Sequence, residues 1–597
     1  MKAALQWTAI ALAASLLAAS PAPPSPAVPT DSSAGRLDAL ANQYWQRQLA
    51  RDFFLRFQIG KPIDTIRPVT YAVADDDARF AESILHGLAQ IDAHALEHDR
   101  WLTYRTLQYL ATNDVAGRTY FWLRQQATPY AGGLQIGTLA TIFADFKFSG
   151  PDDAKRYGSL LEQYAALIAS LRDLLAGQHE RHIILPLAEI DATQAVYEGY
   201  AQPAASDALI PTEDRLQALA PADRAALQSA AKAIVSSKVV PAFASVAAYL
   251  RADYRIGAPT AVGLAQYAGG LGYYRFLVRS YTTLDTTPEK LHALGLEEVA
   301  RLNAHLEEIA HDVGFDGSVA AFKQHLAHDL QFFVKTPAQF GERLETYVQR
   351  SGEAAPRFFA HMPKAPYGVA PLPEALAGAQ TFGYYDQPNA ARPKGLYYYN
   401  AWHPERTSTL SAGALICHEL IPGHHFQIAL QQENTALPDV RHYDFSETGF
   451  VEGWGEYASQ LCWDMGVYQT PYDKAGRLMQ DLMVSVRLVV DTGMNAMGWS
   501  RERAMHYMRE NLTISDSQIA SESLRYSTDI PGQALAYKTG ELTLLQIREH
   551  ARKRLGKTFD IKDFHSWVLD SGSMTLDTLR SHVDYEIERS LKGSPAE

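Results

Sequence analysis

The chain has 597 residues, 47% of them hydrophobic, and its formal net charge is −13. The apolar fraction suffices for a large buried core, and the length alone would allow several domains. The acidic balance argues against a nucleic-acid partner, because binding to phosphates needs basic patches.

Residues 1–28 have the pattern of a secretory signal peptide followed by a Pro-rich start. Lys2 precedes an apolar run from Ala9 to Ala19, and small residues and several prolines follow it. A short basic region, an apolar core of ~7–15 residues and small residues near the cleavage point define such a signal. We therefore expect a periplasmic or secreted protein, with an uncleaved membrane anchor as the alternative. No other run approaches the ~20 apolar residues of a membrane span.

Helical periodicity dominates the rest of the chain and predicts a mainly α fold. Apolar and polar residues alternate with helical spacing over 37–58, 76–92, 152–176, 213–250, 288–313, 339–352, 407–432, 446–465, 475–498, 500–511, 533–555, 564–570 and 576–591. Thr287-Pro288-Glu289 is a helix start with a cap residue, a first-turn proline and an acid. Gly556 is expected to end a helix.

Residues 29–597 are predicted to form a single large helical domain. No clean linker interrupts this region. A division into two lobes, 29–380 and 381–597, is the alternative. Strand signals are few, and the clearest is the Tyr-rich run Gly395–Asn400.

Residues 418–425 read His-Glu-Leu-Ile-Pro-Gly-His-His, which looks like a lengthened zinc-hydrolase helix motif. In the common motif two histidines four residues apart bind zinc, and the glutamate beside the first activates the metal-bound water. Here Pro422 stands where the second histidine should be. In a straight helix His418 and His425 would lie roughly 10 Å apart along the axis, and His424 would point about 120° away from His418.

A continuous helix therefore cannot form the site. Pro422 removes an intrahelical hydrogen bond, and Gly423 relaxes the backbone. Kinks and bulges at such residues often mark functional sites. We expect a bulge at 420–423 that absorbs the two extra residues and brings His424 back beside His418.

Glu452 is the best candidate for a third ligand. A glutamate on a second helix commonly completes such a site and leaves the fourth position for water. Glu456 falls one turn later on the same face and could hold a ligating histidine by a hydrogen bond; Glu447 is a weaker alternative ligand. Apolar neighbours favour a metal site over a solvated acidic face. We expect one zinc ion per chain, bound by His418, His424 and Glu452, although ligand type alone does not exclude other divalent metals.

The two cysteines, Cys417 and Cys462, lie in the predicted metal helices. An exported protein can pair them in a disulfide. Two buried free thiols, which behave as small hydrophobic groups, are equally compatible with the sequence. Cys417 points to a different helix face from His418 and is not expected to bind the metal.

The sequence His-Glu-x-x-Pro-Gly-His-His, followed by Glu-Gly-Trp-x-x-Tyr, resembles the bacterial domain-of-unknown-function family 885. That family looks like a branch of the gluzincin metallopeptidases. The resemblance runs from about residue 35 to the C-terminus, with one departure at Ser573-Met574-Thr575, where the family pattern has Leu-Pro. It implies a large multi-helix fold with a deep channel and a small β element beside the metal helix. It also favours His424 over His425, because several relatives have Gly-His at the second ligand.

The resemblance implies a zinc-dependent hydrolase, which the signal pattern marks as exported, but it does not supply a substrate. Because helical relatives enclose deep channels that admit short chains, we expect cleavage of short peptides or peptide-like amides, by an oligopeptidase or a carboxypeptidase. Glu419 is expected to take the proton of the metal-bound water and to deliver it to the leaving amine. The oxyanion needs a hydrogen-bonding neighbour, for which we expect Tyr526 and Tyr537. Arg525 and Lys538, in the same segment, are expected to bind substrate.

Gluzincin relatives bind extended peptides along the edge of a strand upstream of the metal helix. Gly395–Asn400, with Tyr398 and Asn400, is therefore expected to bind substrate by edge-strand addition. An ordinary buried aromatic strand is the alternative.

Two other functions remain open. One is a metal-dependent hydrolase of a non-peptide amide or ester. The other is a catalytically inactive peptide- or metal-binding protein. The presence of Glu419 beside His418 argues against the second, because binding alone needs no general base.

Overall fold

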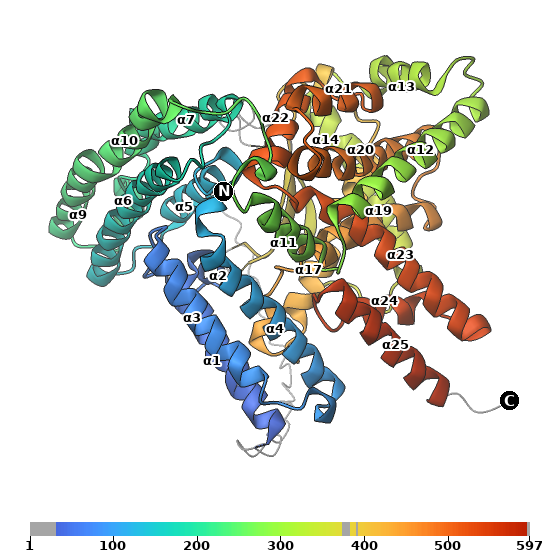
Figure 1. The fold of residues 1–597 in the computed structure, drawn as a ribbon, viewed down its shortest axis with the longest axis horizontal. Helices are drawn as coiled ribbons and strands as arrows, with labels where there is room; N and C mark the ends of the chain where they lie inside the picture. Colours follow the sequence, from blue (N-terminus) through green and yellow to red (C-terminus); the bar gives the residue numbers. More distant parts are fainter. Residues whose placement is uncertain (1–31, 373–382, 390–391, 594–597) are drawn as a thin grey trace, which may run out of the picture.

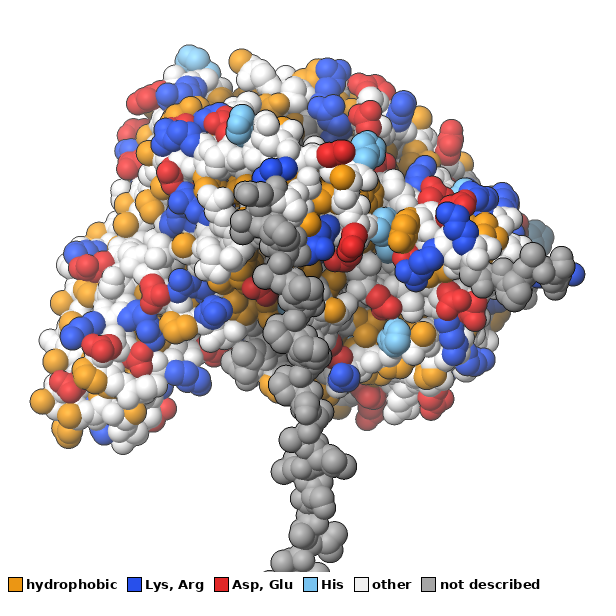
Figure 2. All heavy atoms as spheres, turned by 90° about the horizontal axis from the view of Figure 1, so that it is seen from below, with side chains coloured by type: hydrophobic (Ala, Val, Ile, Leu, Met, Phe, Trp, Pro, Cys, Tyr) orange, Lys and Arg blue, Asp and Glu red, His pale blue; other side chains and the backbone are white. Residues whose placement is uncertain are grey.

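The computed structural model describes residues 32–372, 383–389 and 392–593, which are mainly helical (Figure 1). The signal peptide and Pro-rich start expected over 1–28 lie outside the described residues. On the face drawn in Figure 2, basic and acidic side chains are interspersed.

The N-terminal helices occupy one side of the molecule (Figure 1). They are α1 (Ser33–Arg51), α2 (Phe53–Gln58), α3 (Tyr71–Leu88), α4 (His98–Thr119), α5 (Leu134–Asp145), α6 (Pro151–Glu180), α7 (Leu187–Ala201), α8 (Pro203–Asp207), α9 (Pro221–Ile234) and α10 (Val240–Arg251). Buried side chains between Ile63 and Tyr254 form a hydrophobic cluster of their own, with Leu161, Ile168 and Phe243 fully enclosed.

Two predicted helices are interrupted in this part. The helix expected over 37–58 stops at Asp52, whose side chain accepts hydrogen bonds from the N–H groups of Phe54 and Leu55 and so caps a second helix. The segment expected as one helix over 213–250 begins with a 3₁₀ turn, and the α-helix starts only at Pro221, since proline fits the first turn but not the interior of a helix.

Pro221–Arg255 is long and apolar enough to cross a membrane by length and composition, and 33% of its most apolar window is buried. Its apolar face packs in the N-terminal cluster through Leu227, Val235, Val239 and Phe243. The buried part of this segment is therefore a face of the N-terminal cluster.

The second half of the chain surrounds the motif. Its helices are α11 (Gly270–Thr282), α12 (Pro288–Asp312), α13 (Val319–His328), α14 (Pro337–Ala354), α16 (Ala412–Glu419), α17 (His424–Glu433), α18 (Asp439–His442), α19 (Thr448–Asp464), α20 (Pro471–Ala496), α21 (Arg501–Asn511), α22 (Asp516–Leu524), α23 (Ala536–Leu555), α24 (Ile561–Leu569) and α25 (Leu576–Gly593). The start predicted at Thr287-Pro288 is confirmed, because the Thr287 side chain accepts from the N–H of Lys290. Gly556 ends α23 with a positive φ, as predicted.

A small sheet lies beside the motif helices. Its strand order is β1 (Tyr367–Pro371), β3 (Gly395–Tyr399), β2 (Tyr384–Asp386), with β1 parallel and β2 antiparallel to β3. The predicted strand is therefore confirmed, but the expectation that a peptide adds to its edge is wrong. Tyr397 of β3 lies between Val369 of β1 and Tyr385 of β2, so both edges of β3 are already paired.

Three glycines bring the backbones of α19 and α23 into contact. A Cβ at Gly453 would lie 2.5 Å from the Cα of Gly540, and a Cβ at Gly540 would lie 2.2 Å from the carbonyl oxygen of Gly449. Any larger side chain would push the helices apart, and α19 carries Glu452. The position of this predicted ligand thus depends on close helix packing.

The two cysteines form a disulfide that joins α16 to α19. The Cα atoms of Cys417 and Cys462 are 6.5 Å apart, and the bond closes a loop with a sequence separation of 45 residues. The helix with His418 and the helix with Glu452 are thereby linked covalently.

We predict that the Cys417→Ser, Cys462→Ser double variant unfolds at a lower temperature than the oxidised protein. Closing a loop of this length stabilises a fold by about 4 kcal/mol in the chain-entropy account. Thermal unfolding followed by circular dichroism, with and without reductant, measures the difference. Reductant should lower the midpoint of the natural chain and leave the double variant unchanged. Equal midpoints for the oxidised and reduced natural chain would contradict the stabilising role.

Candidate metal centre

The motif helix is broken between its histidines. α16 ends at Glu419, Leu420 leaves the helical region, and α17 begins at His424. The expected bulge within one helix is therefore wrong, and the two histidines lie on separate helices. Two contacts fix the break: the indole N–H of Trp454 donates to the carbonyl of Pro422 at 2.9 Å, and a Cβ at Gly423 would lie 1.8 Å from the carbonyl oxygen of His418.

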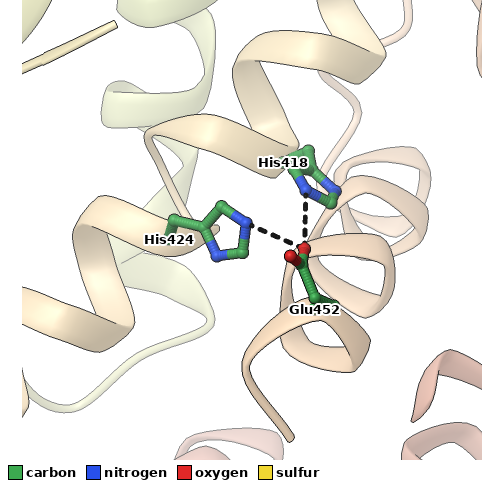
Figure 3. Close-up of side chains that lie close together, drawn as sticks. All are labelled: His418, His424 and Glu452. Atoms are coloured by element: carbon green, nitrogen blue, oxygen red, sulfur yellow. Dashed lines mark ion pairs between the residues drawn. The ribbon is translucent and has the colours of Figure 1, made fainter. Parts of the chain in front are cut away.

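The break brings His418 and His424 to one carboxylate (Figure 3). The Nε2 atoms of His418 and His424 lie 3.7 and 3.4 Å from Oε2 of Glu452. One ligand atom from each of the three residues lies within 4.8 Å of the other two. Zinc bonds of about 2.0–2.1 Å at tetrahedral angles would separate ligand atoms by about 3.3–3.4 Å. The separations are close to these values, so two imidazoles and one carboxylate fit a zinc ion.

His425 points away from this group. It is fully buried, its Nδ1 lies 2.9 Å from the hydroxyl of Tyr385, and its Nε2 lies 3.0 Å from the carbonyl of Ala365. Burial lowers the pKa of its imidazole to about 4. Both ring nitrogens thus contact the region of the small sheet, and His425 is a structural residue.

The outer face of His418 is held by α19. Nδ1 of His418 lies 3.2 Å from Oε1 of Glu456, whose other oxygen accepts from the Arg477 guanidinium at 3.0 Å. Gly455 packs against the imidazole, where a Cβ would lie 2.7 Å from Cε1. Burial lowers the pKa of His418, but Glu452 and Glu456 outweigh it and raise the pKa to about 10. The ring orientation is therefore fixed from both sides.

Glu419 follows His418 at the end of α16 and is half-buried. Burial raises the pKa of its carboxyl, while the imidazoles of His418 and His424 act against the increase. Its charge also raises the pKa of Tyr385 and Tyr397, after the larger effect of burial. The charge of Glu419 therefore acts both on the two histidines and on the tyrosines of β2 and β3.

The two tyrosines predicted for the oxyanion differ in position. The ring of Tyr537 stacks beside that of His418, with centroids 6.2 Å apart. Its hydroxyl accepts from Arg525 at 3.5 Å and from Gln533 at 3.4 Å, and among the described contacts its own proton has no acceptor. The hydroxyl of Tyr526 donates to Glu522 and accepts from Arg487 at 2.7 Å. Tyr537 can thus donate at the site, whereas the hydroxyl of Tyr526 is already engaged.

Arg525 and Lys538, the two residues predicted to bind substrate in this segment, also differ in their surroundings. The Nη2 of Arg525 donates to Gln533 at 2.9 Å, and Gln533 in turn donates to Glu452 at 3.5 Å, so Arg525 lies next to the predicted ligands. Lys538 is buried, and its ammonium contacts three carboxylates, those of Asp481 at 2.6 Å, Glu541 at 3.0 Å and Glu298 at 3.0 Å. These contacts use its three donors, so the expected contact between Lys538 and substrate does not fit the structure.

The predicted binding residues of β3 lie away from Glu419. Side chains alternate along a strand, so Tyr398 points to the opposite face from Tyr397, where it packs on Tyr384 at 5.4 Å. Asn400 follows the strand, and its side chain accepts from the N–H of Trp402 at 3.0 Å. Tyr397 and Tyr385 pair across β3 and β2, and the charge of Glu419 acts on the pKa of both. Tyr397 could have been predicted from the sequence, because side chains alternate between the two faces of a strand. Tyr385 could not, because the three-residue strand that carries it has no recognisable sequence pattern.

One protein family and two solved structures are similar to this chain over most of its length. The profile of a family described as "Bacterial protein of unknown function (DUF885)" matches residues 56–583. A "putative lipoprotein" from Colwellia psychrerythraea has a similar structure, with TM-score 0.83 and 24% identity over 94% of this chain and 100% of that chain. A "putative lipoprotein of unknown function" from Shewanella oneidensis has TM-score 0.68 and 18% identity, over 92% and 99% of the two chains. No curated protein matches. The two likenesses establish a shared fold along nearly the whole chain.

We predict that His424→Ala removes stoichiometric zinc and that His425→Ala retains it. His424 supplies one of three converging ligand atoms, whereas His425 contacts Tyr385 and Ala365. Elemental mass spectrometry of the purified protein after zinc loading measures the metal content. The His425 variant should instead unfold more easily, by about 1–3 kcal/mol, since buried partners lose their hydrogen bonds. Zinc loss confined to the His425 variant would reverse the assignment.

Proposed function

The chain belongs to the DUF885 family of bacterial proteins, and we propose that it is an exported zinc-dependent hydrolase that cleaves peptide bonds of short peptides. One observation carries the proposal: His418, His424 and Glu452 present convergent ligand atoms, and a second carboxylate, that of Glu419, follows His418 in the chain. Three protein ligands with a remaining position for water are typical of catalytic zinc sites, whereas structural sites have four protein ligands.

Zinc bound to these residues would lower the pKa of a water ligand and polarise a substrate carbonyl. Glu419 is half-buried and adjacent to both imidazoles, with a raised pKa. A carboxylate in this position can take a proton from the attacking water and pass it to the leaving amine. Tyr537 can donate its free hydroxyl proton to the oxygen that becomes negative, while Arg525 and Gln533 hold that hydroxyl in place.

The burial of the site supports a small or extended substrate. His418 is 5% exposed and His424 is 9% exposed, so a folded protein surface could not reach the atoms between them. Arg525 lies next to Glu452 through Gln533 and has a side chain that is 14% exposed. An extended peptide is narrower than a folded domain, and it offers carbonyl groups that Tyr537 could contact.

An exported location is part of the proposal. Lys2 and the apolar run from Ala9 to Ala19 have the pattern of a secretory signal. The disulfide between Cys417 and Cys462 is of the kind that persists in oxidising compartments. The two proteins of similar fold are described as lipoproteins, which agrees with an envelope location.

We predict that Glu419→Gln lowers turnover by about 10²–10⁴-fold with zinc still bound, because the amide cannot take a proton. A mixture of short peptides, amides and esters, incubated with the zinc-loaded protein and read by mass spectrometry, identifies the substrate first. Glu307→Gln, on the exposed face of α12, is the matched control and should leave the rate unchanged. Full activity in the Glu419 variant would exclude it as the base. Cleavage of esters or simple amides without peptides would refute the peptide part of the proposal.

We further predict that Tyr537→Phe lowers kcat by about 10²–10³-fold, the usual loss when an oxyanion donor is removed. Tyr526→Phe should have a much smaller effect on kcat, because its hydroxyl contacts Glu522 and Arg487 instead. Both variants are compared at equal zinc content, so that folding defects do not count as catalytic losses. If the two variants lost kcat equally, Tyr537 would have no special role.

A further inference from the structure

A second group of buried oxygen atoms lies where α19 begins. Glu447 precedes the helix and is 0% exposed, yet neither of its carboxylate oxygens has a hydrogen-bond partner among the described residues. Oδ2 of Asp444, three residues earlier, is also buried without a hydrogen-bond donor, and the carboxyl groups of Asp444 and Glu447 lie within hydrogen-bonding reach of each other. A buried, ionised carboxylate without a partner costs several kcal/mol. Two such groups together require a positive charge or a proton.

Uncharged oxygens converge on the same place from other elements. The hydroxyl of Tyr109, on α4, lies 3.1 Å from the carbonyl oxygen of Ser280 and 3.3 Å from that of Ser446. Ser446 stands between Asp444 and Glu447 in the chain, so the hydroxyl of Tyr109 lies beside the segment that carries both carboxylates. Burial raises the pKa of Tyr109, and the charges of Glu447 and Asp444 raise it further. The oxygens come from α4, from the end of α11 and from the loop before α19.

The basic residue closest in sequence does not neutralise the pair. Burial and the charge of Asp444 raise the pKa of Glu447, and the charge of Arg441 only opposes this increase. The Arg441 guanidinium donates to Asp99 at 2.8 Å and to the carbonyl of Ser571 at 2.6 Å. The described hydrogen bonds of this guanidinium are therefore all made to residues other than Asp444 and Glu447. Within the described residues, no basic side chain forms an ion pair with Asp444 or Glu447.

We propose that this cluster binds a calcium ion. Its carboxylate ligands are Asp444 and Glu447, and the neighbouring oxygen donors are the Tyr109 hydroxyl and the carbonyls of Ser280 and Ser446. Calcium is coordinated by oxygen alone, from carboxylates, carbonyls and water, in flexible geometry. The set contains no imidazole or thiolate, unlike the group formed by the histidines, so the two sites select different metals.

The ion would connect three elements at the start of the helix that carries Glu452. Gly449, the second residue of α19, already packs against the end of α11, where a Cβ would lie 2.6 Å from the carbonyl oxygen of Thr282. Calcium at Asp444 and Glu447 would fix this contact by charge as well as by packing. Its role is structural, and it is independent of the proposed peptide hydrolysis.

The test is calorimetric titration of calcium into the zinc-loaded mature protein, prepared in calcium-free buffer. We expect one calcium ion per chain and a rise in the unfolding temperature of about 2–4 °C at calcium concentrations near 100 times Kd. Asp444→Asn and Glu447→Gln should each abolish both effects. Asp152→Asn removes an exposed acid paired only with Lys155 and should change neither. Glu452→Gln should weaken zinc binding and keep calcium binding.

Two results would overturn the site. Absence of calcium binding to the natural chain would mean that a proton shared by the two carboxyl groups compensates their burial. Calcium binding that persists in both the Asp444 and Glu447 variants would place the ion elsewhere. If either variant fails to fold, titration of the natural chain still decides between an ion and a shared proton, because it needs no substitution.

Discussion

The burial of Arg477 between two carboxylates determines how the helices around the histidines fit together. Arg477 on α20 is 0% exposed and contacts Glu456 of α19 at 3.0 Å and Glu541 of α23 at 2.8 Å. Removing one partner of such a buried pair costs about 3–5 kcal/mol, because the remaining charge is uncompensated. Glu456 in turn contacts His418, so the docking of three helices and the orientation of one predicted ligand depend on the same guanidinium.

This network continues behind the site and explains the position of Lys538. The carboxylate of Glu541 lies between Arg477 and Lys538, and Asp481 and Glu298 complete the environment of the ammonium. At the front, the carboxylates of Glu419, Glu452 and Glu456 surround two imidazoles. Acidic groups thus outnumber the fixed positive charges at the site, and a bound cation would correct that excess. The buried basic residues stabilise the surrounding structure, and the histidines remain available as ligands.

The features that could be predicted from the sequence are those set by residues close together in the chain. Thr287-Pro288 predicted a helix start, and the spacing of His424 from His418 showed that the helix must be disturbed. The form of the disturbance depends on Trp454, whose contact with the Pro422 carbonyl comes from another helix and leaves no trace in the motif. The edge of β3 was predicted wrongly for the same reason: its partner β2 has only three residues and carries no recognisable strand pattern.

The roles of neighbouring side chains were equally hard to assign. Tyr526 and Tyr537 lie only 11 residues apart in the sequence, but a π-helical segment over Arg525–Asp529 carries Tyr526, whose hydroxyl accepts from Arg487. Side-chain direction after an irregular turn follows from the backbone path, which composition does not specify. Lys538 follows Tyr537 directly and points about 100° away on the same helix, into the acidic network.

The helix α19 shows why so many features of the site are linked. Over its 17 residues it presents Glu452 and Glu456 to the histidines, Gly453 to α23, and Cys462 to α16. Nearly every face is therefore buried against a different partner, as expected for a helix without a solvent-facing side. A substitution that shifts the helix toward one partner must pull it from another. The predicted ligand Glu452 is therefore held in a fixed position, because α19 cannot move toward one partner without losing contact with another.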